Sequence, residues 1–208
     1  MGSGKFITLE GGEGLGKSTN LHFIKDFLEN NGLSVRVTRE PGGTPLAEQI
    51  RCLLLEERSE SVAEQTELLL MFSARAQHLK EVIYPALAQG QWVISDRFTD
   101  ATYAYQGGGR AIDVSLIQQL ETWVQGTFRP DLTLLLDAPI NIGMSRMKER
   151  VISDRFEQEQ FPFFERVRQA YLLQAQKNPD RIQVVNANQS LTAVQSDIVS
   201  HLLSLLKK

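Results

Sequence analysis

The chain has 208 residues, of which 42% are hydrophobic and 23% charged, so we expect one globular domain spanning residues 1–208 and not a disordered chain. Its formal net charge is −3, without the basic excess typical of nucleic-acid-binding proteins, so we expect no nucleic-acid partner. No apolar run approaches the ~18 residues of a membrane span, and Cys52 is the only cysteine, so we expect a cytoplasmic protein with no membrane segment and no intrachain disulfide.

Short apolar runs alternate with longer amphipathic segments along the chain. In chain order the pattern predicts a strand over Phe6–Leu9, a helix over Ser18–Asn30, a strand over Ser34–Thr38, a helix over Leu46–Glu56, a long helix over Glu64–Gln89 bent near Pro85, a strand over Trp92–Ser95, a helix over Asp113–Gln125, a strand over Leu132–Leu136, helices over Ile140–Glu149 and Phe161–Lys177, a strand over Ile182–Val185 and a last helix over Leu191–Leu206. Such alternation predicts an α/β fold with a five-stranded parallel sheet flanked by helices, whose ligands bind at the carboxyl ends of the strands.

Residues 11–18 carry a phosphate-binding motif. They match G-x-x-x-x-G-K-[ST] and lie between a predicted strand and a predicted helix. In this motif backbone N–H groups cradle the phosphates, Lys17 reaches the β- and γ-phosphates, and the Ser18 hydroxyl ligates Mg²⁺. The motif predicts a three-layer fold like that of P-loop NTP hydrolases and a triphosphate site made by Gly11, Gly12, Glu13, Gly14, Leu15, Gly16, Lys17, Ser18 and Thr19. The alternative is a glycine-rich turn with a solvated lysine.

Four arginines, Arg39, Arg51, Arg75 and Arg97, are candidates for a second anionic ligand, because arginine binds phosphate in a fork-like geometry. Arg39 and Arg97 each lie just after a predicted strand, which places both at the ligand edge of the sheet. A kinase whose acceptor is itself phosphorylated needs such cations in addition to the phosphate loop. Each arginine could instead be a surface ion-pair partner.

Five further segments resemble the thymidylate kinase family: residues 38–44 (Thr-Arg-Glu-Pro-Gly-Gly-Thr), 75–78 (Arg-Ala-Gln-His), 96–98 (Asp-Arg-Phe), 104–110 (Ala-Tyr-Gln-Gly-Gly-Gly-Arg) and 130–137 (Pro-Asp-Leu-Thr-Leu-Leu-Leu-Asp). They occur in the family's order between about residues 5 and 165. The resemblance implies transfer of the γ-phosphate of ATP to dTMP, giving dTDP and ADP on the way to dTTP and DNA precursors. It also implies Mg²⁺ as cofactor and a homodimer.

The resemblance also implies roles for individual residues. Asp96 and Ser18 would place Mg²⁺, and Arg97 would bridge the donor and acceptor phosphates. Tyr105 would lie near the sugar and disfavour a ribose 2′-hydroxyl. The residues implied to bind dTMP are Glu13, Arg39, Pro41, Arg51, Phe72, Arg75, Arg97, Thr102, Tyr105 and Gln106.

Two positions depart from the family pattern. Ala101 stands where the family often has serine, so one polar contact is missing or moves to Thr102. The family's base-stacking phenylalanine commonly lies four residues before the arginine, where this chain has Met71, whereas Phe72 is three before it. Both spacings share a helix face with Arg75. Phe72 is therefore expected either to stack on the base or to pack in the core.

The charged segment at about residues 146–158 has no apolar periodicity. It is expected to be either a solvated helix end or a lid that closes over ATP and excludes water. The resemblance favours the lid, because the bacterial subtype of the family lacks an arginine in its phosphate loop and takes a catalytic one from the lid. Arg150 and Arg155 are the candidates, and they join Lys17, Asp96 and Arg97 as expected catalytic residues.

Other classes of phosphate-loop protein fit the sequence less well. The Asn-Lys-x-Asp motif of common GTPases does not occur, and a mechanical ATPase has no need of a second set of arginines. A non-enzymatic nucleotide sensor would not need Lys17, Asp96 and Arg97 together. The remaining alternative is a kinase for another pyrimidine nucleoside monophosphate, which would differ only in the base pocket.

Overall fold

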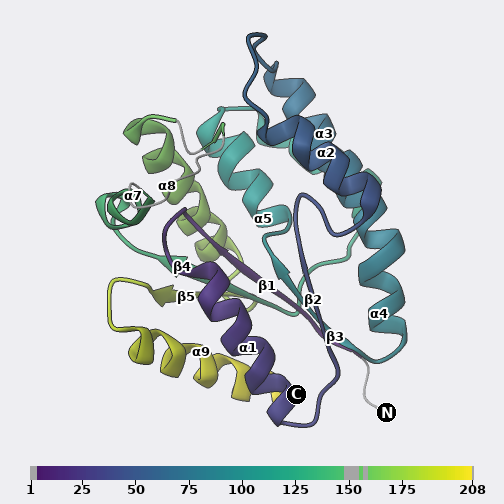
Figure 1. Cartoon of the computed structure of the whole chain (residues 1–208), viewed down its shortest axis with the longest axis vertical. Coiled ribbons are helices and arrows are strands. Elements are labelled where there is room, and N and C mark those ends of the chain that lie inside the picture. The colour runs from purple at the N-terminus through teal and green to yellow at the C-terminus, as the bar shows by residue number, and fades with distance from the viewer. Residues whose placement is uncertain (1–3, 148–154, 157–158, 208) are drawn as a thin grey trace.

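The computed structural model describes residues 4–147, 155–156 and 159–207. Its centre is a five-stranded sheet, drawn in Figure 1, with strand order β2-β3-β1-β4-β5 and every neighbouring pair parallel. The strands are β1 (Phe6–Gly11), β2 (Val35–Arg39), β3 (Trp92–Asp96), β4 (Leu132–Asp137) and β5 (Ile182–Asn186). The predicted α/β fold with a five-stranded parallel sheet is confirmed.

Helices cover both faces of this sheet (Figure 1). They are α1 (Lys17–Asn30), α2 (Pro45–Leu55), α3 (Glu64–His78), α4 (Tyr84–Ala88), α5 (Thr99–Thr102), α6 (Val114–Gln125), α7 (Ile140–Met147), α8 (Phe161–Lys177) and α9 (Leu191–Leu206), with π-helical segments η1 (Leu79–Ile83) and η2 (Tyr103–Gly109). Within the described part of the chain, no helix is long and apolar enough to cross a bilayer.

The alternation of side chains along β1 explains the three layers. Ile7 and Leu9 face one side and pack in a buried cluster with residues of α1 and α9. Phe6 faces the other side and packs with residues of η1 and α4. Because successive side chains of a strand point to opposite faces, a strand with apolar side chains on both faces must be covered on both sides. In β4, Leu134 packs in the cluster with α1 and α9, and Leu135 packs in another cluster with residues of α8.

Two helical segments differ from the sequence pattern. The helix predicted over Glu64–Gln89 is α3, η1 and α4 in succession, so the wide π turn comes just before Pro85. Proline has no N–H and its ring clashes with the carbonyl four residues earlier, which a regular α-helix cannot accommodate. The helical stretch from α5 through η2 was not predicted, since Gly107–Gly109 reads as a loop. These glycines allow close packing: a Cβ on Gly108 would lie 2.6 Å from the Ala170 Cβ on α8.

Candidate active site

The loop from β1 to α1 forms an anion cradle at the carboxyl edge of the sheet. Gly14 and Gly16 adopt φ angles of 71° and 82°, which glycine reaches without steric cost. Lys17 is 8% exposed, and its Nζ donates to the carbonyl oxygens of Gly11 at 3.1 Å and Gly12 at 2.7 Å. The helix α1 begins at Lys17, so its positive N-terminal end points at the same place.

Helix α7 lies directly against this loop. A Cβ on Gly14 would come within 2.3 Å of the Gly143 carbonyl oxygen, and a Cβ on Gly143 within 2.4 Å of the Glu13 carbonyl oxygen. The approach therefore needs glycine on both sides. Sequence analysis missed Gly143, although an isolated glycine within a helical pattern is a signal of close packing.

Among the cavities at this edge of the sheet, two adjoin and have four lining residues in common. The cavity beside the phosphate loop, here the loop cavity, is lined by Gly14, Leu15, Gly16, Lys17, Ser18, Arg39 and Asp96. The second, here the inner cavity, is lined by Pro41, Leu55, Met71, Arg75, Phe98, Ala101, Thr102, Tyr105, Gln106 and Phe156. Glu13, Glu40, Arg51 and Arg97 belong to both linings. The molecule thus offers two adjoining binding spaces with a charged boundary.

Arg97 stands at that boundary. Its backbone adopts φ 69°, a conformation that costs a non-glycine residue energy and is often retained at functional sites. Its guanidinium donates to the Gly11 carbonyl at 3.1 Å, to the Tyr171 hydroxyl at 3.0 Å, to the Tyr105 hydroxyl at 2.8 Å and to the Glu13 carboxylate. Four acceptors, two in the phosphate loop and one each in η2 and α8, therefore fix one cation between the cavities.

A buried chain of hydrogen bonds continues behind Arg97. The Tyr171 hydroxyl donates to Glu10 Oε2 at 2.8 Å, and the Phe98 backbone N–H donates to Glu10 Oε1 at 2.7 Å. Burial, with the nearby Asp100 carboxylate, raises the pKa of Glu10 to about 8. Sequence analysis missed both residues: Tyr171 accepts a hydrogen bond from Arg97, and Glu10 accepts one from Tyr171.

The raised pKa of Glu10 predicts a pH-dependent stability. An unfolded carboxyl ionises near 4.5, whereas the folded one keeps its proton up to about 8. Between these two pH values unfolding therefore releases a proton from Glu10. The contribution of Glu10 to the free energy of unfolding is fully present below pH 4.5. It falls as pH rises toward 8, by up to about 1.4 kcal/mol per pH unit. Glu10→Gln should flatten this slope in melting curves recorded from pH 5 to 8.5. Glu121→Gln, a buried carboxylate on α6, should keep it, and equal slopes in all three proteins would contradict the prediction.

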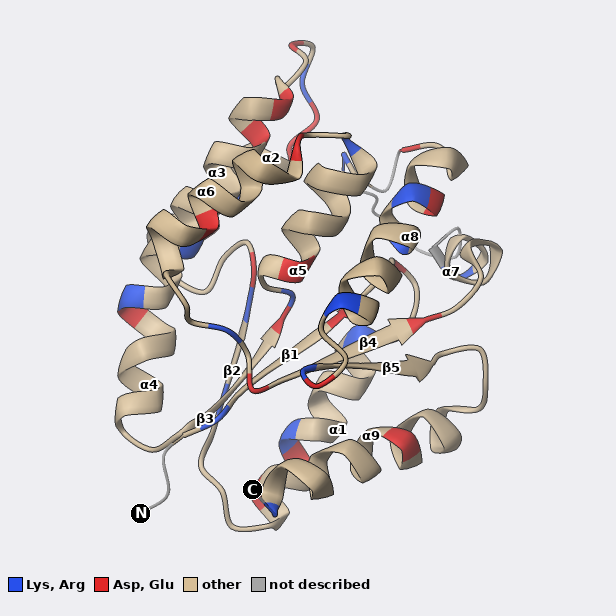
Figure 2. Ribbon diagram, turned by 180° about the vertical axis from the view of Figure 1, so that it is seen from behind, with Lys and Arg blue, Asp and Glu red and all other residues tan. Residues whose placement is uncertain are grey.

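Asp96 is the last residue of β3 and lines the loop cavity. Figure 2 shows the acidic and basic positions along the ribbon in red and blue. Asp96 Oδ1 is buried and has no hydrogen-bond partner among the described residues. Ser18 is exposed near the start of α1 and lines the same cavity. A carboxylate and a hydroxyl are oxygen donors of the kind Mg²⁺ takes when it also binds water and phosphate. No cluster of three or more His, Cys, Asp or Glu that could hold a metal occurs in the described part of the chain.

A buried polar network forms the floor of the inner cavity. Glu40 accepts from Arg75 Nε at 2.8 Å and His78 Nδ1 at 2.9 Å, and Arg75 Nη2 donates to the Thr102 hydroxyl at 2.9 Å. Burial opposes ionisation of Glu40, but Arg75 and His78 outweigh it and lower its pKa. Arg75 Nη1 is left without a partner within the described structure, which leaves its NH2 group to donate to a ligand.

The inner cavity gathers eight of the ten residues expected to bind dTMP: Glu13, Pro41, Arg51, Arg75, Arg97, Thr102, Tyr105 and Gln106. Arg39 is placed elsewhere. It lines the loop cavity, is 54% exposed, and its Nη2 pairs with Glu48 Oε2 at 2.8 Å.

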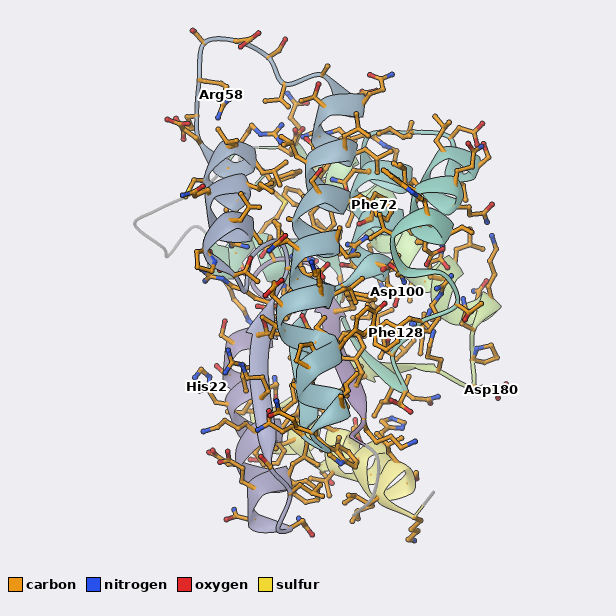
Figure 3. The ribbon with its side chains drawn as sticks, turned by 90° about the vertical axis from the view of Figure 1, so that its right-hand side faces the viewer. His22, Arg58, Phe72, Asp100, Phe128 and Asp180 are labelled. Atoms are coloured by element: carbon orange, nitrogen blue, oxygen red, sulfur yellow. The ribbon has the colours of Figure 1, made fainter. Side chains whose placement is uncertain are left out.

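Phe72 is also placed away from the cavity. It lies on α3, labelled in Figure 3, and packs in a buried cluster with Leu68, Tyr103 and Ile117. Met71 lines the cavity in its place. A single step along a helix rotates a side chain by ~100°, and that rotation separates the two positions. Of the two roles left open by the sequence, the geometry corresponds to core packing.

The remaining expected residues are less central. Leu15 packs in the core under the phosphate loop, Gly11 and Gly12 hold Lys17 through their carbonyls, and Thr19 is exposed on α1. Arg155 lies away from the loop cavity: its Nη2 pairs with Glu67 Oε2 at 2.6 Å. The other lid candidate, Arg150, lies outside the described residues.

Phe98 and Phe156, which sequence analysis missed, supply aromatic walls of the inner cavity. Phe98 follows Arg97 directly, and Phe156 follows Arg155. The adjacency of both to expected site residues was the available signal, but adjacency alone does not say which side chain faces a cavity.

Comparison with known proteins identifies the family. The thymidylate kinase family profile matches residues 9–198. A thymidylate kinase from Pseudomonas putida (strain GB-1) is 58% identical over 206 residues, covering 99% of this chain and 98% of the relative. One from Teredinibacter turnerae is 54% identical over 196 residues, covering 94% and 96%. The crystal structure of thymidylate kinase from Ehrlichia chaffeensis superimposes with a TM-score of 0.76 at 35% identity, covering 97% of this chain and 99% of that one. A phosphate cradle, a charged boundary and an inner cavity are thus combined on the fold of known relatives, and the chain belongs to the thymidylate kinase family.

Proposed function

We propose that the chain transfers the γ-phosphate of ATP to dTMP and releases dTDP and ADP, a step toward dTTP and DNA precursors. In this proposal the loop cavity takes the phosphates of ATP and the inner cavity takes dTMP. The residues that line both cavities then lie where the two phosphate groups meet. Direct in-line transfer needs little covalent help from the protein and depends on positioning and charge neutralisation.

The observation that carries the base assignment is a donor and an acceptor held in the inner cavity. Arg75 Nη1 is an unused donor. The Gln106 amide N–H donates to Glu67 Oε1 at 2.8 Å, which leaves the side-chain carbonyl oxygen of Gln106 for a ligand. Thymine and uracil carry a carbonyl oxygen beside an N–H on their pairing edge, whereas cytosine carries an amino group beside a bare nitrogen. The arrangement supports a thymine or uracil base and disfavours cytosine.

The groups around the phosphates receive the following roles. Lys17 binds the donor phosphates, and Arg97 neutralises charge on the group in transit. The Ser18 hydroxyl and Asp96 Oδ1 would hold Mg²⁺, which supplies charge neutralisation on the phosphate oxygens when bound. Arg39 binds the acceptor phosphate from the loop cavity. Tyr105, whose hydroxyl lies between Arg97 and Glu13, faces the sugar and disfavours a 2′-hydroxyl.

The segment at residues 146–158 is proposed to act as a lid on the single domain 1–208. Arg155 is committed to Glu67 and to the Leu54 carbonyl, the latter at 2.9 Å. Arg150 is therefore the proposed catalytic arginine of the lid, and Arg155 the proposed anchor. An Arg150→Ala variant with wild-type kcat would contradict this assignment.

We extend the proposal to a homodimer in the cytoplasm. The large exposed side chains of Trp123 and Leu116 on α6 support an assembly, since exposed aromatic groups are enriched at interfaces. Cys52 as sole cysteine agrees with a reducing compartment. Sedimentation as a monomer at micromolar concentration would contradict the dimer.

The test is a coupled assay of ADP release from ATP and Mg²⁺ with dTMP, dUMP, dCMP, UMP or CMP in separate wells, and a control without acceptor. Turnover should be strongest with dTMP and weakest with the two cytosine nucleotides, because their base edge mismatches both fixed groups. Preference for dUMP over dTMP would favour the alternative, a kinase for another pyrimidine nucleotide. Equal ADP release in every well, the control included, would mean ATP hydrolysis without transfer and would contradict the proposal.

A further inference from the structure

Glu67, in the first turn of α3, is a fully buried carboxylate that binds three side chains from two other segments. Its Oε1 accepts from Gln106 Nε2 at 2.8 Å and from Arg110 Nε at 3.3 Å, and its Oε2 accepts from Arg155 Nη2 at 2.6 Å. Arg110 also pairs with Glu159, so the cluster holds two carboxylates and two guanidinium groups. A buried charge must be compensated in this way to be tolerated.

The cluster fixes the orientation of the Gln106 amide. The two ends of a glutamine amide have nearly the same shape, and the hydrogen-bond partners decide which end is which. A carboxylate accepts hydrogen bonds and does not donate them. The nitrogen of Gln106 must therefore face Glu67, and its oxygen must face away from it. Gln106 also lines the inner cavity, so the group that it offers to a base is an acceptor.

Glu67 also holds part of the cavity wall through Arg155. The Arg155 guanidinium lies 4.5 Å from the centre of the Phe156 ring, and the Arg110 guanidinium lies 5.6 Å from it. Phe156 in turn lines the inner cavity and meets the Tyr105 ring edge to face, with 6.0 Å between centroids. One carboxylate thus orders both a polar contact and an aromatic contact of the same cavity.

We propose that Glu67 is a specificity-determining positioning residue, which holds the Gln106 amide oxygen and, through Arg155, the Phe156 ring toward the base. Glu67 does not line the inner cavity and acts only through Gln106 and Phe156, which do line it. The proposal rests on the assignment of the inner cavity to the base of dTMP. It adds to that assignment the reason why the cavity discriminates between bases.

Glu67→Gln tests the first part, because a glutamine of the same size can donate as well as accept and no longer forces the Gln106 amide one way. The ratio of kcat/KM for dTMP to that for dCMP should fall on the order of tenfold or more. Glu121→Gln is the matched control: Glu121 is also buried and accepts from the Tyr103 hydroxyl at 2.7 Å. Its ratio should stay at the wild-type value. A folded Glu67→Gln enzyme with the wild-type ratio overturns the proposal.

Two further variants make the test complete. Arg155→Met keeps the Gln106–Glu67 hydrogen bond but loses the anchor of Phe156, so it should raise KM for dTMP and dCMP together and leave their ratio unchanged. If Glu67→Gln does not fold, Gln106→Met takes its place and should lower the ratio to the same degree; an unchanged ratio there also overturns the proposal. The wild-type preference for dTMP is measured first, and its absence would count against the proposed function and not against Glu67 alone.

Discussion

Replacing Arg97 with alanine is expected to lower kcat roughly 30- to 1,000-fold. This corresponds to a loss of ~2 to 4 kcal/mol of transition-state stabilisation, the range for losing one preorganised charge donor. Arg97 lies on the boundary of both cavities, and in the proposed mechanism the transferred phosphoryl group passes this boundary. Its position is fixed before substrate binds, so little reorganisation is needed when charge develops. Steady-state kinetics with ATP and dTMP varied in turn give kcat and both KM values.

The structure supplies a control for this experiment. Arg129 pairs with Glu121 at 3.1 Å, is part of neither cavity, and is far more exposed than Arg97. Arg129→Ala should leave kcat within about twofold of wild type, because Arg129 lines neither cavity. Melting temperatures of both variants are needed, since Arg97→Ala leaves the Glu13 carboxylate with fewer partners. A folded Arg97→Ala enzyme with normal kcat would remove Arg97 from the mechanism.

The fold and the phosphate loop could be predicted because both depend on patterns among residues close together in the sequence. A strand, a glycine-rich turn ending in Lys17 and Ser18, and an amphipathic helix follow one another within 30 residues, and parallel strands place their carboxyl ends together. The same logic brought Asp96 and Arg97 to the site, since they are the first two residues after the third predicted strand. Five strands and their alternation with helices needed nothing beyond hydrophobic periodicity.

The supporting residues could not be predicted, because their partners are distant in the chain. Tyr171 and Glu10 are 161 residues apart, and on α8 Tyr171 fits the apolar periodicity of an ordinary core residue. Glu67 reads as a solvated glutamate at a helix start until Arg110 and Arg155 are seen beside it. The exchange of Phe72 for Met71 came from the rotation of α3, which tertiary packing sets. In each case the sequence motif indicated the residues of the site, whereas tertiary packing determined which residues line the cavity and which support them.

Lys17→Met is expected to lower kcat/KM for ATP by about 10²- to 10³-fold, again the effect of one preorganised charge at a phosphoryl group. Lys17 is the cation of the loop cavity that lies inside the phosphate loop itself, with Glu13 3.7 Å away. Burial and the nearby Arg97 lower the pKa of Lys17, and the phosphates of ATP would act in the opposite direction by favouring its charged form. Methionine keeps most of the chain length and removes only the charge and the donor.

The two cavities allow the loss to be assigned to the donor side. Lys17 is not part of the inner cavity lining, so dTMP should still raise the melting temperature of Lys17→Met by nearly the wild-type amount. Lys25→Met on the same helix is the matched control: Lys25 is exposed and pairs with Glu29 at 3.4 Å, and its loss should change kcat/KM by less than about twofold. If Lys17→Met binds dTMP normally yet keeps its kcat/KM for ATP within threefold of wild type, phosphate binding must rest on the backbone of the loop and on Arg97. If it loses both ligands together, the lysine orders the loop through its bonds to Gly11 and Gly12, and its charge is secondary.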